Sequence, residues 1–139
     1  IERQEFDTHI QKKETDILAV LRGEYDGLIA DEELLVREYE LAKQVYAERA
    51  SSGMKVIDTA VILNYIKDIH SLIEMQKIKI SEKKSQMEMQ SEKLILVTQD
   101  KMTVEKLRDN QLDIYNTEQR KSDEKFIEEF LSNRSSSVV

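Results

Sequence analysis

The stretch from Val56 to Leu131 contains neither proline nor glycine, and it constrains the fold more than any other part of the sequence. Its apolar residues recur every seven positions in one row, with a companion row three or four residues away: Ile66, Ile73, Ile80, Met87 and Leu94, and then Ile62, Ile69, Val97 and Val104. This heptad pattern predicts one long α-helix with a narrow apolar seam. A chain of 139 residues cannot bury such a helix in a globule, so the helix needs a partner along its length.

The segment from about Glu2 to Ala50 has the same periodicity and is the natural partner. Its two rows are Leu21, Leu28, Leu35 and Ala42, and Leu18, Tyr25, Tyr39 and Tyr46, with Glu32 interrupting the second. Residues 51–55 form the one clear break, and Gly53 suits the left-handed conformation that often follows a helix C-terminus. A connection this short predicts an antiparallel hairpin in which Leu28 lies near Ile80 and Leu21 near Met87.

The two predicted helices differ in length. In this register Ile1 lies near Lys106, so about 25 residues of the second helix extend past the first. The extension ends in the apolar cluster Phe126, Ile127, Phe130 and Leu131, and such a cluster usually needs a cover. We therefore expect a single all-α coiled-coil domain over residues 1–131 (helix 2–50, turn 51–55, helix 56–131) and a serine-rich disordered tail over residues 132–139.

Composition excludes several classes of function. The formal net charge of −7 and the absence of a basic stripe argue against nucleic-acid binding. The longest apolar runs, Ala60–Leu63 and Leu94–Val97, are too short to insert into a membrane. There is no cysteine, which fits a reducing cytosol, and no glycine-rich phosphate loop. His9 and His70 lie on different helices without supporting carboxylates. The sequence therefore predicts neither an enzyme nor a bound cofactor or metal.

Polar residues interrupt the apolar seam and leave two interpretations open. They can specify the register of the hairpin, since a polar seam residue costs stability but excludes alternatives. They can also face a second protein. Gln76 and Lys83 favour the first interpretation. Arg108, Lys121, Asp123 and Glu124 are expected to lie beyond the first helix, without an intramolecular partner.

Three features together resemble the FliJ family, the coiled-coil component of the bacterial flagellar type III export apparatus. The first is the layout of a short helix, a Ser52-Gly53-Met54 turn and a long helix. The second is Leu63-Asn64-Tyr65-Ile66, with Leu72 one heptad after Tyr65. The third and most specific is Glu105-Lys106-Leu107-Arg108 followed by Glu118-Gln119-Arg120-Lys121-Ser122-Asp123-Glu124.

This resemblance implies a central stalk, similar in shape to the γ subunit of rotary ATP synthases. The open end of the hairpin would enter and stimulate the hexameric export ATPase, and the tip would face the export gate membrane protein. Export chaperones are further implied partners, and the location is cytoplasmic, peripheral to the inner-membrane apparatus. The implied ATPase-facing residues are Glu105, Lys106, Leu107, Arg108, Lys121, Asp123, Glu124, Phe126 and Phe130. The implied tip residues are Tyr39, Tyr46, Tyr65 and Leu72.

Two alternatives remain open at this point. A stalk of a virulence-type secretion system would share the fold and the mechanism but bind a different ATPase. A structural coiled-coil spacer or adaptor would show a uniform seam and no specific motif at a free helix end.

Overall fold

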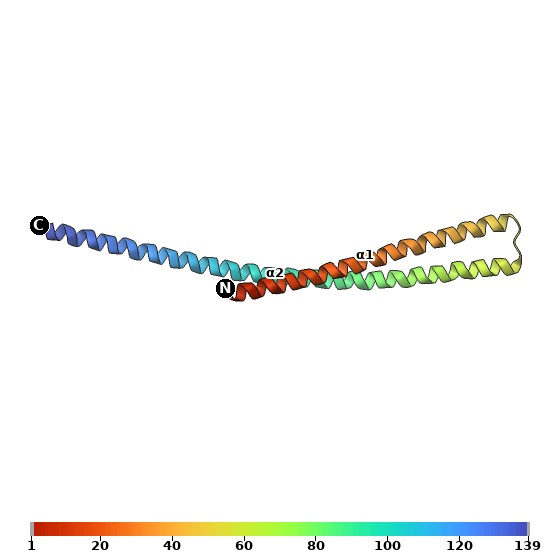
Figure 1. Cartoon of the computed structure of the whole chain (residues 1–139), viewed down its shortest axis with the longest axis horizontal. Helices are drawn as coiled ribbons and strands as arrows, with labels where there is room; N and C mark the ends of the chain where they lie inside the picture. The colour runs from red at the N-terminus through yellow and green to blue at the C-terminus, as the bar shows by residue number, and fades with distance from the viewer. Residues whose placement is uncertain (1, 139) are drawn as a thin grey trace. The chain divides into compact units, whose positions relative to one another are not determined.

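The computed structural model describes residues 2–138, with side chains described for residues 2–135. Helix α1 spans Glu2–Ser51 and helix α2 spans Val56–Val138 (Figure 1). No strand occurs within the described range. The all-α prediction, with a second helix longer than the first, is confirmed.

Cross-helix contacts show that α1 and α2 are antiparallel. As the residue number rises along α1, its partner's number falls along α2: Glu14 contacts Gln90, Glu24 contacts Lys83, and Glu38 contacts Tyr65. Figure 1 shows the two helices lying side by side from the turn onward. This order is the predicted antiparallel one, and at Leu28 the residue of α2 that makes contact is Gln76.

The seam of the hairpin is thin because each helix offers only one stripe of side chains. The buried apolar residues of the described chain are Leu18, Ala42, Ile69 and Ile73. Three of them, Ala42, Ile69 and Ile73, form the core cluster, against which Leu35, Tyr39 and Ile66 pack. These residues are the ones that the heptad rows marked. Burial of this one stripe supplies the hydrophobic stabilisation of the fold.

The turn between the helices is made by serine and glycine. The hydroxyls of Ser51 and Ser52 donate to the Glu48 carbonyl at 2.8 and 3.1 Å, which satisfies a carbonyl at the end of α1. Gly53 has φ of 83°, the left-handed region that a side chain disfavours. The predicted role of Gly53 in ending the first helix therefore agrees with the backbone.

The chain divides into two compact units, and each is described by itself. The hairpin unit, residues 12–95, holds the core cluster and the turn. The end unit consists of residues 1–11 and 96–139. In the end unit, α1 accompanies α2 as far as Arg108, and α2 then continues alone. We call residues 109–135 the overhang.

The C-terminal residues differ from the prediction of a disordered tail. Helix α2 continues through Val138 and so includes residues 132–138 of the predicted tail, and Val139 lies outside the described residues. The physical reason is that no proline or glycine stands there to end the helix, whereas serine lowers helix propensity only slightly.

Candidate functional sites and family

Three polar side chains of α2 face α1 within the hairpin unit, one heptad apart. Gln76 is only 8% exposed, and its amide donates to the Leu28 carbonyl at 2.9 Å. Lys83 Nζ lies 2.5 Å from the Glu24 carboxylate. The Gln90 amide donates to the Glu14 carbonyl at 3.0 Å and to its carboxylate at 2.6 Å. Each contact would be lost if the helices slid past one another, so these residues select one register.

Glu14 is the buried acid of the seam, at 5% exposure. The hydrogen bond from Gln90 lowers the pKa of Glu14; desolvation opposes this shift, and Lys93, at 3.3 Å, adds to the lowering. Lys13 adds a further favourable charge. A carboxylate this well satisfied stays ionised in the folded chain, where it helps to hold α1 against α2.

We expect the thermal stability of the chain to fall in acid because of Glu14. The pKa of Glu14 in the folded chain lies below the ordinary value of 4.5. Its contribution to the free energy of unfolding is therefore fully present above pH 4.5 and is lost as the pH falls through the folded pKa. Between neutral and acidic pH, the melting temperature of Glu14→Gln should fall less than that of the native chain. The exposed Glu33→Gln variant is the matched control and should follow the native profile. Identical acid slopes for all three chains would contradict this role for Glu14.

In the end unit, α1 and α2 are joined by polar side chains. The Gln11 amide donates to Thr98 at 3.2 Å, and Lys101 donates to Gln11 at 3.0 Å. Arg108 donates to the Gln4 side chain. The expectation that Arg108 lies beyond the first helix is therefore wrong. The reason is that Arg108 lies only two residues past the predicted end of the paired region at Lys106, and its long side chain reaches Gln4 on α1.

Three further sequence-predicted residues directly precede Arg108 on α2. Glu105 lies 4.0 Å from Lys101, one turn before it, and is half-buried beside α1. Lys106 and Leu107 are exposed on the outer surface of α2. This motif therefore stands where the paired part of the end unit gives way to the overhang.

The overhang exposes nearly all of its side chains. Only Thr117 is half-buried among residues 109–135. Phe126 is 69% exposed, and Ile127, Phe130 and Leu131 are each more than half exposed. In the described chain, Lys121, Asp123 and Glu124 form no ion pair. The overhang therefore presents an uncovered apolar cluster accompanied by charges that are free to pair with another molecule.

The four tyrosine and leucine residues predicted at the tip do not share one surface. Tyr39 and Tyr46 are half-buried in the seam, and Tyr39 packs against the core cluster and lies 5.9 Å from the His70 ring. Tyr65 and Leu72 are about half exposed. The Tyr65 hydroxyl donates to the Glu38 carboxylate, and this bond raises the pKa of Tyr65. Only Tyr65 and Leu72 are therefore available to a partner.

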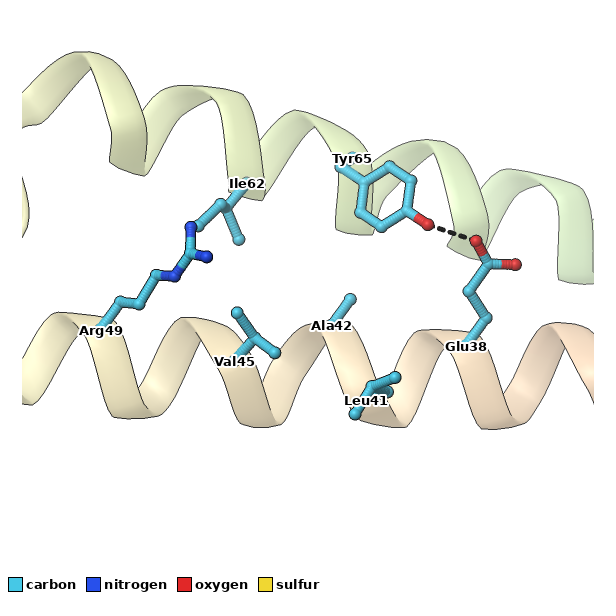
Figure 2. Close-up of a pocket in the computed structure, with 7 residues that line it drawn as sticks. All are labelled: Glu38, Leu41, Ala42, Val45, Arg49, Ile62 and Tyr65. Atoms are coloured by element: carbon cyan, nitrogen blue, oxygen red, sulfur yellow. Dashed lines mark hydrogen bonds between the residues drawn. The ribbon is translucent and has the colours of Figure 1, made fainter.

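An apolar groove lies between the two helices beside Tyr65, and the sequence analysis missed it. Its volume is about 190 Å³, and its lining residues are Glu38, Leu41, Ala42, Val45, Arg49, Ile62 and Tyr65. Figure 2 shows the Arg49 side chain near Ile62 at one end and the Tyr65–Glu38 hydrogen bond at the other. One feature of the sequence pointed to this groove. Leu41, which lines it, and Leu34, seven residues earlier, are apolar but lie outside the two seam rows, and both are about 60% exposed.

Comparison with known protein families assigns the chain. A model of the family described as flagellar FliJ protein matches residues 4–137, which is nearly the whole sequence. The chain belongs to the flagellar FliJ family. No curated protein and no solved structure gave a match.

FliJ proteins are stalk components of the flagellar export apparatus, so the resemblance based on the turn, the Tyr65 motif and the Glu105–Arg108 motif is confirmed. Members of the family are structural parts of that apparatus. No helix in the described range has an apolar stretch long enough to cross a membrane. The family links this chain to the flagellar export apparatus.

Proposed function

We propose that this chain is the stalk that inserts the overhang of α2 into the ring of the hexameric export ATPase and stimulates its turnover. The observation that carries the proposal is the overhang itself. It is a single helix with Phe126, Ile127, Phe130 and Leu131 uncovered, on a protein whose family belongs to the export apparatus. The central opening of a ring supplies the cover that this helix lacks.

The overhang has the chemistry of an interface anchor. Aromatic side chains at the centre of an interface often carry most of the binding energy, and charges at its rim steer association. Phe126 and Phe130 fit the first role, and Lys121, Asp123 and Glu124 fit the second. A stalk stimulates a ring by binding one state of its subunits more tightly than another, so the chain contributes no catalytic group.

The test combines the purified chain with the purified flagellar export ATPase of the same bacterium. Binding and ATP turnover are measured in the same samples. We expect saturable binding together with a rise in turnover. A virulence-type export ATPase serves as the comparison, and we expect it to bind more weakly because the family match is to a flagellar protein. A flagellar ATPase that neither binds the chain nor responds to it would refute the proposal.

We also propose that the tip of the hairpin binds the export gate, so that the chain links the ATPase to the gate. Tyr65 and Leu72 support this part because both are on α2 near the turn and about half exposed. We expect Tyr65→Ala combined with Leu72→Ala to weaken binding to the cytoplasmic domain of the gate protein by about tenfold or more, while the melting temperature changes little.

Tyr39→Ala is the control for this experiment, because Tyr39 packs against the core cluster rather than facing outward. It should lower the melting temperature while the folded chain still binds the gate domain. Binding can be measured by calorimetry well below the melting temperature of each variant. If the Tyr65 and Leu72 double variant binds as tightly as the native chain, the gate contact lies elsewhere.

A further inference from the structure

The groove of the hairpin unit has one free charge at its tip end. Among the described residues, Arg49 forms no ion pair, and its side chain lies at the rim of the groove (Figure 2). Glu38, at the opposite end, is engaged by the Tyr65 hydroxyl. Between them the walls are apolar: Leu41 is 61% exposed, and Val45 and Ile62 are half-buried. The groove therefore suits an apolar helix face that carries a carboxylate at one end.

The overhang has this pattern. Asp123, Phe126, Ile127 and Phe130 stand at positions i, i+3, i+4 and i+7, which places them on one face of α2. Leu131 widens the apolar part of that face. Asp123 forms no ion pair in the described chain. The face thus begins with a free carboxylate and continues as an apolar stripe.

The two surfaces also match in spacing. If an overhang lies antiparallel to α1 with Asp123 beside Arg49, the equal rise of the two helices brings Ile127 opposite Val45 and Leu131 opposite Leu41. The large Phe130 side chain then meets Ala42, the small residue at the floor of the groove. One alignment therefore satisfies the charge pair and the size of the facing side chains together.

We propose that the groove beside Tyr65 binds the overhang of a second copy of this chain, with Asp123 of one copy paired to Arg49 of the other. The helix lies in the groove in the manner of other amphipathic helices that bind between two helices. Because the two surfaces differ, the contact is heterologous. Two copies can each place their overhang in the groove of the other, which gives a closed dimer. Otherwise the contact repeats from copy to copy and gives longer assemblies as the concentration rises.

The experiment measures the mass of the pure chain by sedimentation over a concentration series, without any ATPase. We expect the native chain to self-associate. The groove variant Leu41→Glu and the overhang variant Phe126→Glu with Phe130→Glu should each remain monomeric. Both changes are at exposed positions, so neither should disturb folding, and circular dichroism checks this. The controls Ile78→Glu and Ile114→Glu replace exposed isoleucines outside the two surfaces and should associate like the native chain.

Mixing the two variants gives the decisive result. The groove variant still has a native overhang, and the overhang variant still has a native groove, so the mixture should form a one-to-one complex although neither chain associates alone. Asp123→Arg should weaken association by about tenfold or more, and the double variant Asp123→Arg with Arg49→Asp, which reverses both charges in every copy, should restore it. A native chain that stays monomeric overturns the proposal. So does a mixture that stays monomeric, or a groove variant that still associates alone, because overhangs would then pair with each other.

Discussion

A chain that ends after Asn116 should lose all stimulation of the export ATPase. The deletion removes Lys121, Asp123, Glu124, Phe126 and Phe130, which supply both the charges and the aromatic anchors of the proposed insertion. The truncated chain keeps only residues 109–116 of the overhang, which lack the cluster of Phe126, Ile127, Phe130 and Leu131. Turnover of the ATPase, measured over a titration with the truncated chain, should remain at the level of the ATPase alone.

The same truncation should leave the hairpin unit intact, and this makes the result interpretable. The core cluster of Ala42, Ile69 and Ile73 lies in residues 12–95, far from the deletion in sequence. The melting temperature and the cross-helix contacts near Gln76 should therefore match the native chain. A truncated chain that stimulates the ATPase as well as the native one would contradict the stalk proposal and favour a structural spacer.

A milder variant checks that the aromatic residues, rather than helix length, cause the effect. Phe126→Ala with Phe130→Ala keeps the overhang helical, because alanine is the strongest helix former. It should reduce stimulation strongly, whereas Ile114→Ala, also on the overhang but outside the cluster, should preserve it. Equal stimulation by both variants would show that the cluster is not the anchor.

Ile69→Ala should cause a large loss of stability. Ile69 is 3% exposed and belongs to the core cluster, so removing its side chain loses the transfer free energy and leaves a cavity, for a cost of about 2–5 kcal/mol. In a seam this thin, few other contacts compensate. Chemical denaturation monitored by circular dichroism measures the free energy of unfolding directly.

Ile78→Ala is the matched control, with the same substitution on the same helix. Ile78 is 59% exposed, so its replacement should change the free energy of unfolding by only about 0.5 kcal/mol. The ratio between the two losses reports how strongly the hairpin depends on its seam. Similar losses for Ile69→Ala and Ile78→Ala would mean that the outer surface of α2 is also packed, as in a higher assembly.

The heptad rows could identify the core because burial in a two-helix hairpin follows directly from spacing. Ile69, Ile73 and Ala42 were assigned to the seam by their positions alone, and they are the core cluster. The break at Gly53 and the antiparallel arrangement followed from turn chemistry and a short connection. Local pattern and tertiary contact coincide here, since each helix has only one neighbour.

The surfaces of the chain were harder to derive, because they depend on which side of each helix faces away from the seam. Tyr39 and Tyr65 look alike in sequence, yet Tyr39 packs into the core while Tyr65 reaches Glu38 at the surface. The contact between Arg108 and Gln4 depends on how far a long side chain reaches across to the other helix, which periodicity does not specify.

The sequence by itself therefore determined the two helices, their antiparallel pairing, the residues of the seam and the overhang, because all of these are set by spacing along one chain. Only the tertiary structure decided which polar residues meet across the seam and where a groove forms. The pair of Glu14 with Gln90 and the groove from Glu38 to Arg49 are each made by side chains of both helices. The register of the two helices decides which of these side chains come into contact. A shift of a single turn would separate those groups, and no periodic pattern distinguishes one turn from the next.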